Sequence, residues 1–76
     1  MYVAKTEKDK FLQVFGKHLA DTRREKNFSQ EQLAFDADID LSTISKIERG
    51  VLNVSVFNIY KIAKALKVSP KDLLDF

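Results

Sequence analysis

The chain has 76 residues, of which 45% are apolar, two are Gly and one is Pro, so it fits one small domain and is too poor in turn-forming residues for a many-stranded sandwich. It contains no Cys and one His, which excludes disulfides and thiolate zinc sites, and we expect no metal and no cofactor. Thirteen basic and eleven acidic residues give a net charge of +2, a mild excess that permits binding to nucleic acid without requiring it.

Residues 1–8 show no clear hydrophobic periodicity, and we expect them to form a flexible tail in front of a single domain at residues 9–76. The start of the chain lacks the apolar stretch of a secretory signal. No apolar run in the sequence approaches the roughly 18 residues of a membrane span. These features predict a cytoplasmic protein with no membrane contact.

Two amphipathic helices are predicted in the first half of the domain. The first begins at Asp9 and spans about 17 residues, because its apolar side chains recur every three or four residues and form one stripe. Residues 27–29 end it. Ser29 and Gln32 then form a capping box at the start of a short second helix. The apolar positions of the two helices are Phe11, Leu12, Phe15, Leu19, Leu33, Ala34 and Ala37.

A very short third helix is predicted at residues 41–49. It follows a turn at residues 38–40, where Asp is suited to left-handed backbone geometry and to capping the helix that follows. Gly50 stands where the C-terminus of a helix favours a left-handed residue, and residues 51–54 form a loop.

Two further helices complete the chain. Ser55 caps a fourth helix with a second apolar stripe, and Ser69 followed by Pro70 opens a fifth. The core positions of these two helices are Ile59, Ile62, Ala63, Leu66, Leu73 and Leu74. We therefore predict an all-α fold, a compact five-helix domain with almost no strand.

No catalytic or metal-binding constellation is apparent in the sequence. A nucleophilic mechanism needs an oriented base, and His18 stands on a lysine-flanked, outward-facing stretch that predicts a solvated side chain. Asp36, Asp38 and Asp40 lack the Gly and Glu spacing of a calcium loop and suit helix capping better. Two glycines are too few for a phosphate-cradling loop, so we expect that the protein is not an enzyme.

The spacing within residues 29–50 favours a helix-turn-helix, with Ala34 small enough to let the two helices approach closely. At about 100° per residue, one arc of about 140° on the third helix is largely polar, while Ile44 and Ile47 lie opposite. The arc contains Leu41, Ser42, Ser45, Lys46 and Arg49. Such a helix suits the major groove of DNA, whose base edges accept hydrogen bonds from Ser, Lys and Arg. By spacing alone, an ordinary solvated face fits the arc equally well.

A joint pattern is carried by three segments: FGKHLADTRREKNFSQEQLA, LSTISKIERG and NVSVFNIYKIAKALKVSPKDLL. In these segments the sequence resembles the lambda-repressor and Cro-like (XRE-type) helix-turn-helix family, and the resemblance covers residues 15–74. A smaller likeness, in IERGVLNVS and in total length, is to the controller regulators of restriction-modification operons.

The resemblance implies a role for most polar residues of the helix-turn-helix. It assigns base reading to Leu41, Ser42, Ser45 and Lys46. It assigns DNA phosphates to Gln30, Thr43, Arg49 and Asn53, with the free N–H groups at the start of the second helix assisting Gln30.

The resemblance also implies an ion pair. In similar proteins the positions of Arg23 and Glu48 form a partly buried pair that joins the first and third helices, because an Arg fork satisfies an otherwise costly carboxylate. The alternative is that Arg23 lies free on the surface beside Arg24.

Three features depart from the family pattern. Asp38 occupies a turn position that usually carries Gly, which implies an Asp in left-handed geometry. Leu41 cannot hydrogen-bond a base edge and could at best contact a thymine methyl group. Residues 51–54 lack the basic side chains often found there, so the affinity of each subunit for DNA should be modest.

Modest affinity per subunit is usually overcome by a two-fold dimer on a palindromic site whose halves lie about one DNA turn, ~34 Å, apart. We expect the interface to use apolar residues in excess of what the core needs. These are Val56, Phe57, Tyr60, Leu74 and Phe76. The alternative for Phe57 is packing in the core.

The sequence therefore predicts a homodimeric, sequence-specific transcriptional regulator that binds double-stranded DNA and needs no small-molecule effector. The rival hypothesis is a protein-interaction module of the antitoxin or coactivator type, which keeps the fold and has lost DNA binding. Leu41 and the balanced charge of residues 1–38 are its best support.

Overall fold

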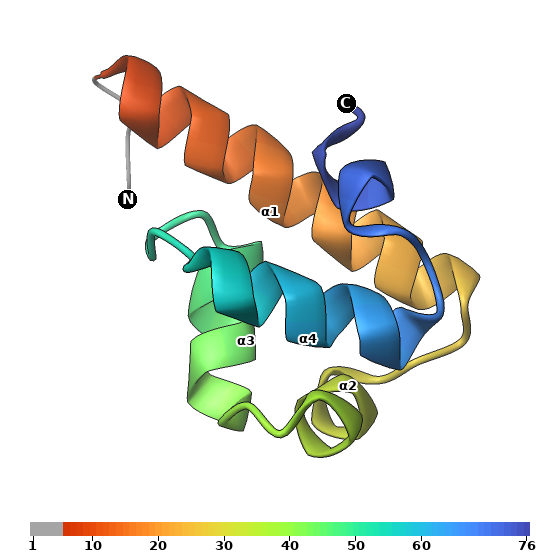
Figure 1. Ribbon diagram of the computed structural model, residues 1–76. Helices are drawn as coiled ribbons and strands as arrows, with labels where there is room; N and C mark the ends of the chain where they lie inside the picture. Colours follow the sequence, from red (N-terminus) through yellow and green to blue (C-terminus); the bar gives the residue numbers. More distant parts are fainter. Residues whose placement is uncertain (1–5) are drawn as a thin grey trace.

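The computed structural model describes residues 6–76, which form four α-helices and one 3₁₀-helix (Figure 1). The elements are α1 (Glu7–Glu25), α2 (Gln30–Ala37), α3 (Leu41–Glu48), α4 (Val56–Leu66) and η1 (Pro70–Leu74). This part of the chain contains no strand, which confirms the all-α prediction. The predicted five-helix count is met in part, because the last of the five elements is a short 3₁₀-helix and not an α-helix. Its tight turn is closed by the Ser69 carbonyl, which accepts from the Asp72 N–H at 2.9 Å.

The first helix begins at Glu7, two residues before the predicted start at Asp9. It does so because Thr6 caps it, with the Thr6 hydroxyl accepting a hydrogen bond from the Asp9 N–H at 3.1 Å. Of the predicted flexible tail, residues 1–5 lie outside the described part of the chain.

All four α-helices end in the same hydrogen-bond pattern, the Schellman motif. A residue with positive φ donates its N–H to the carbonyl three residues earlier, and the next N–H reaches the carbonyl five residues earlier. The residues with positive φ are Asn27 (63°), Asp38 (56°), Gly50 (75°) and Lys67 (61°). The left-handed conformations predicted for Asp38 and Gly50 are therefore confirmed. At Asn27, Asp38 and Lys67 a residue with a side chain occupies a region that favours glycine.

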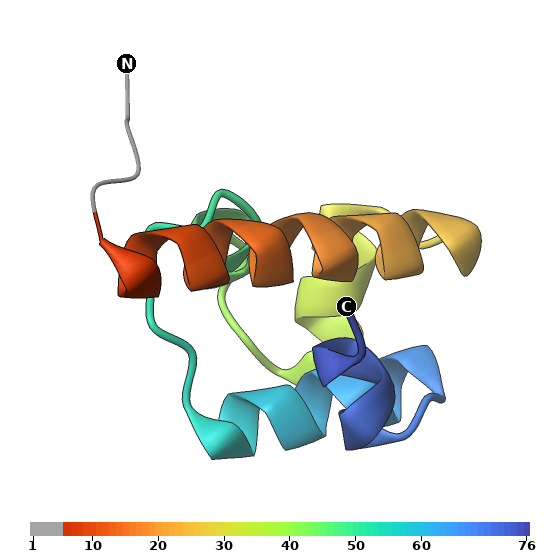
Figure 2. The ribbon, with the colours of Figure 1, turned by 90° about the horizontal axis from the view of Figure 1, so that it is seen from above.

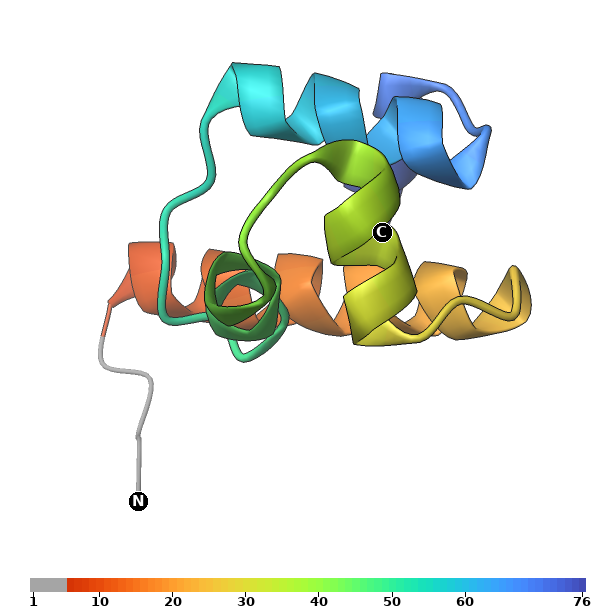
Figure 3. The same cartoon turned by 90° about the horizontal axis from the view of Figure 1, so that it is seen from below.

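The core forms where α1 and α4, on opposite sides of the molecule, are bridged by α2 and α3 (Figures 1 and 3). Viewed from above, η1 lies beside α4 and next to α1 (Figure 2). The buried residues that form the connected core cluster come from all five elements and are Phe15, Leu19, Leu33, Ala34, Ala37, Ile44, Ile47, Ile62, Ala63, Leu66 and Leu73.

Two predicted core residues are not in the core. Phe11 is 50% exposed, whereas Leu12 in the same turn of α1 is 7% exposed, so Phe11 lies at the edge of the helix face that enters the core. Leu74 is 49% exposed, whereas its neighbour Leu73 is fully buried. Successive residues of a tight helical turn point in different directions, so only one of the two leucines can enter the core.

Close backbone packing joins α1 to α3. A Cβ atom added at Gly16 would lie 2.5 Å from the carbonyl oxygen of Glu48 and would also overlap that of Ile47. A Cβ at Gly50 would lie 2.6 Å from the Cα of Gln13. Glycine is therefore required at both crossings. The sequence held a signal for the first one, because a Gly inside a helix costs about 1 kcal/mol relative to Ala and implies a packing reason.

Candidate nucleic-acid interface

The outward face of α3 consists of the residues that the sequence placed on one arc. Ile44 and Ile47 are 0% and 1% exposed and fix the helix on the core from behind. On the opposite side, Ser45 is half-buried, and Thr43, which lies outside the arc, is half-buried as well. The exposed residues of this face are Leu41, Ser42, Lys46 and Arg49. The arrangement presents hydroxyls and two cations on a helix whose other side is anchored by aliphatic packing.

The acidic residues before α3 do less capping than the sequence predicted. Asp40 occupies the N-cap position of α3, but its side chain makes no capping hydrogen bond. Instead, its backbone carbonyl accepts from the Thr43 and Ile44 N–H groups at 3.0 and 3.1 Å. Asp38 caps the C-terminus of α2 through its backbone N–H. Within residues 6–76, no group of three His, Cys, Asp or Glu side chains is arranged to hold a metal ion.

An ion pair inside the protein joins α1 to the end of α3. The Nε atom of Arg23 donates to Oε2 of Glu48 at 2.6 Å, and its Nη2 donates to Oε1 at 3.1 Å. The third arm, Nη1, donates to the carbonyl of Phe28 at 2.8 Å. The side chains of the pair are only 8% and 5% exposed. Arg23 is therefore committed to the interior, and the alternative of a free surface residue is wrong.

Gln30 belongs to the same network, which the sequence did not predict. Its Nε2 donates to Oε1 of Glu48 at 2.8 Å, so the start of α2 is tied to the end of α3. The Gln30 residue is half-buried. A carboxamide nitrogen carries two hydrogens, so one N–H and the carbonyl oxygen are left for a further partner. No local pattern could have revealed this contact, because 18 residues separate its two members.

Two further residues assigned to phosphates, Arg49 and Asn53, lie at and after the end of α3. Arg49 is the C-cap residue of that helix and is exposed. Asn53 is exposed in the loop that leads to α4. Both side chains are therefore accessible to a ligand that lies along the outer face of α3.

An exposed apolar surface lies on the first turns of α4. Val56, Phe57 and Tyr60 are 83%, 64% and 50% exposed, and the rings of Phe57 and Tyr60 stack with their centroids 6.2 Å apart. Packing of Phe57 in the core, the alternative reading of its position, is therefore wrong. We call these three residues the α4 apolar face.

Leu74 and Phe76 have different surroundings. Leu74 is half-exposed, and so is Phe76 at 48%. The Phe76 ring, however, packs on α1, with centroid distances of 5.4 Å to Phe11, 6.2 Å to Phe15 and 5.7 Å to His18. Part of the apolar surface that the sequence assigned to an interface thus covers the protein's own first helix.

His18 is also more engaged than predicted. It is half-buried, and its Nε2 lies 2.8 Å from the carbonyl oxygen of Asp72, so the predicted solvated side chain instead fastens α1 to η1.

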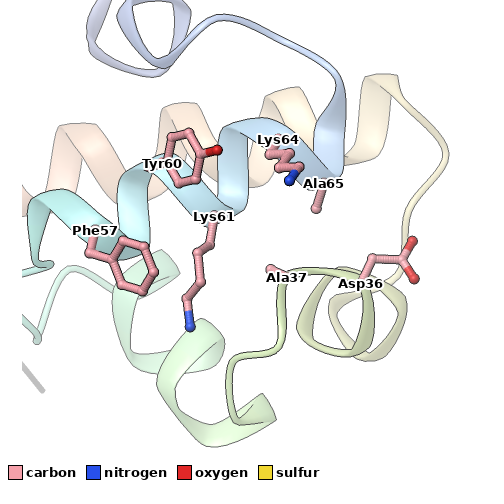
Figure 4. Close-up of a pocket in the computed structure, with 7 residues that line it drawn as sticks. All are labelled: Asp36, Ala37, Phe57, Tyr60, Lys61, Lys64 and Ala65. Carbon is pink, nitrogen blue, oxygen red and sulfur yellow. The ribbon is translucent and has the colours of Figure 1, made fainter.

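A groove of about 450 Å³ separates the end of α2 from α4 (Figure 4). Lys61 crosses it: its Nζ donates to the backbone carbonyl of Asp38 at 3.0 Å and lies 5.2 Å from the centre of the Phe57 ring. Lys64 and Asp36 line the same groove. The α4 apolar face and the turn before α3 are therefore connected through one side chain.

Known proteins resemble this chain in sequence and in fold. A family model described as helix-turn-helix matches residues 19–73. The chain is 56% identical over 64 residues to control protein C.BamHI of Bacillus amyloliquefaciens. The matched region covers 83% of this chain and 79% of that protein.

Two crystal structures extend the comparison. That of the restriction-modification controller protein C.AhdI from Aeromonas hydrophila is 42% identical, with a TM-score of 0.79 over 84% of this chain and 96% of the other. That of the clp gene regulator ClgR from Corynebacterium glutamicum is 26% identical, with a TM-score of 0.80 over 84% of this chain and 68% of the other.

Proposed function

The chain belongs to the helix-turn-helix family of DNA-binding transcriptional regulators, and on this premise we propose that it binds a palindromic operator as a homodimer, with α3 in the major groove. The protein is a regulator and not an enzyme. The observation that carries the proposal is the exposed arc of α3, whose Ser42, Lys46 and Arg49 face solvent while two isoleucines fix the helix from behind.

Base reading in this proposal is assigned to the side chains at the start and middle of α3. Ser42, Ser45 and Lys46 can donate to the acceptors that purines and thymine present in the major groove. Leu41, which is 44% exposed, offers an apolar contact to a thymine methyl group. The expected operator therefore places a thymine opposite the start of α3.

Phosphate contacts are assigned to residues around the arc. Gln30 keeps a free N–H beside its bond to Glu48, and the N-terminal amides of α2 add donors next to it. Thr43, Arg49 and Asn53 would contact the backbone on either side of the groove. Only Arg49 in this set carries a charge, so the affinity of each subunit should be modest and the salt dependence shallow.

Dimerisation is assigned to the α4 apolar face together with Leu74 and the exposed side of Phe76. An exposed aromatic pair beside an 83% exposed Val56 is a surface that a second copy would cover. A two-fold dimer would present two α3 helices to half-sites ~34 Å apart.

A controller role in a restriction-modification system, acting in the cytoplasm, is the specific version of this proposal. C.BamHI and C.AhdI are a control protein and a restriction-modification controller by name, and both are similar to this chain over most of its length. In that role the regulator would respond to its own concentration, through dimerisation and operator occupancy, without a small-molecule effector.

Selection of bound sequences from a random duplex pool tests the base-reading assignment. Lys46→Ala should change which bases are preferred, whereas Gln30→Ala should weaken binding to all sequences alike. A Lys46→Ala variant that selected the wild-type sequence would contradict the assignment.

A salt titration on random duplex tests the rival hypothesis of a protein-interaction module. Counterion release predicts that duplex affinity falls as salt rises. A module that binds only protein would show no duplex affinity at any salt concentration.

A further inference from the structure

We infer that Lys61 is a positioning residue that couples the α4 apolar face to the placement of α3. Lys61 lies on α4 and has no place on the DNA-facing arc, so its effect on operator binding would act through the turn before α3. The inference rests on the proposed function, because it assumes that the α4 apolar face meets a second copy and that α3 enters DNA.

The contacts form a continuous chain from the surface of α4 to the turn. Tyr60 stacks on Phe57 with an interplanar angle of 13°, and the Lys61 ammonium lies 5.2 Å from the centre of the Phe57 ring. The same ammonium donates to the carbonyl of Asp38 at 3.0 Å. Figure 4 shows the Lys61 side chain extending beside Phe57 away from α4 toward the segment between α2 and α3.

The carbonyl of Asp38 is a sensitive point in the turn. Asp38 adopts φ 56° and ψ 50°, a left-handed conformation that is strained for a residue with a side chain. Its N–H is already bonded to the carbonyl of Phe35 at 3.2 Å. A cation on its carbonyl oxygen therefore holds the peptide plane between Asp38 and Ile39, in the turn that precedes Leu41, the first residue of α3. The bond is charge-assisted, which makes it stronger than a neutral one.

A second copy on the α4 apolar face would strengthen this chain of contacts. Phe57 is 64% exposed in the single subunit, so water competes for the ammonium–ring interaction. Covering the ring removes that water and restricts the rotamers of Lys61, which favours the geometry that reaches Asp38. Dimerisation would then pre-organise the start of α3, and by linkage operator binding would tighten the dimer.

The experiment compares two lysines of the same groove. Lys61→Met keeps the length and apolar stem of the side chain and removes the donor. Lys64→Met is the matched control, because Lys64 lines the same groove, carries the same charge, and has a side chain that makes no hydrogen bond or ion pair within residues 6–76. Lys61→Arg restores a cationic donor. For each protein, the affinity is measured for a duplex selected from a random pool and for a scrambled duplex, at one salt concentration.

We expect Lys61→Met to reduce the ratio of specific to scrambled affinity roughly tenfold relative to Lys64→Met, on the scale of one hydrogen bond to a charged group. Lys61→Arg should remain within about threefold of wild type. A purely structural role would instead lower both affinities together and would appear in the melting temperature. Equal ratios for Lys61→Met and Lys64→Met, with wild type still selective, would overturn the inference and leave the proposed function intact. A wild-type protein that binds no duplex would overturn both.

A double-variant cycle tests the coupling itself. In a Phe57→Leu background, which keeps apolar bulk and removes the ring, Lys61→Met should cost only about threefold in the same ratio. If the two effects simply multiplied, Lys61 would act on the turn without the α4 apolar face, and the coupling would be refuted.

Discussion

The recognition helix is held very differently at its two ends. Its C-terminal end is locked on α1 by backbone packing at Gly16 and by the Arg23–Glu48 pair, whose side chains are 8% and 5% exposed. Its N-terminal end follows a strained turn that is supported across an open groove by one half-buried lysine. The first end is rigid because it is buried and has little room to move. In our inference, the second end responds to a partner on the α4 apolar face.

Removing the buried carboxylate of Glu48 should have the largest effect on the stability of the fold. Glu48→Ala leaves the guanidinium of Arg23 buried without its counter-charge, which should lower the free energy of unfolding by about 3–5 kcal/mol. For a domain of this size such a loss approaches the whole stability. Urea denaturation followed by circular dichroism measures it.

A paired replacement serves as the control. Arg23→Met with Glu48→Met removes both charges and keeps the volume, so most of the lost stability should return. If Glu48→Ala alone cost less than about 1 kcal/mol, the ion pair would not be what locks the C-terminal end of α3.

Adding a methyl group where α1 crosses α3 should have the next largest effect on stability. Gly16→Ala forces α1 away from the carbonyls of Ile47 and Glu48, and overpacking against backbone that cannot yield should cost about 3 kcal/mol. Lys17→Ala, at the next and exposed position, is the control and should change stability little. Similar melting temperatures for the two variants would show that the crossing is looser than the structure indicates.

Replacing a residue with positive φ at the end of a helix by glycine should increase stability. Lys67→Gly removes the Cβ from a residue at φ 61° and should stabilise the domain by about 1 kcal/mol, which raises the melting temperature by about 4–8 °C. Asp38→Gly should gain less, because Asp tolerates this region better than Lys. A larger gain at Asp38 than at Lys67 would mean that the turn before α3 stores more strain than the end of α4.

Breaking the exposed Lys17–Asp21 ion pair on α1 should have the smallest effect on stability, in contrast to breaking the buried Arg23–Glu48 pair. A hydrogen bond from Lys17 Nζ, 2.9 Å from Oδ2, holds the pKa of Asp21 below its ordinary range. Because the folded pKa is the lower one, the pair stabilises the fold above about pH 4 and loses this contribution as the pH falls further.

Lys17→Met should therefore raise the pKa of Asp21 toward its ordinary range, as measured by NMR titration. The melting temperature at neutral pH should stay within experimental error, because solvent screens an exposed pair. An unshifted pKa would mean that Lys17 does not hold the carboxylate in solution.

The local parts of the fold were predictable from the sequence, and the departures have specific causes. Ser29 and Ser55 cap α2 and α4 with hydrogen bonds of 3.0 Å, as their spacing indicated. The start of α1 was misplaced because Thr6 lies before the first apolar position. The type of the last helix was misjudged because a capping pattern marks where a helix begins and does not fix its hydrogen-bond spacing.

The features of the candidate site likewise divide into those that the sequence predicted and those that it did not. The exposed arc of α3 follows from helical periodicity, which depends only on residues within a few positions of one another. Gln30 reaching Glu48 and Lys61 reaching Asp38 depend on how separate helices cross, and no short-range pattern encodes these meetings. His18 was misjudged for the same reason, and the packing of the Phe76 ring on α1 was not foreseen, because the contacts of both side chains come from a distant segment of the chain.

By itself, the amino-acid sequence determined which segments are helical, where most of them start and stop, and which side of α3 is polar, because capping and periodicity act over one or two turns of chain. Only the tertiary structure decided that a glycine lets α1 touch α3, that Gln30 shares a buried carboxylate with Arg23, and that one lysine spans the groove to the turn. These contacts join residues 18 to 32 positions apart, and their geometry exists only once the core has packed.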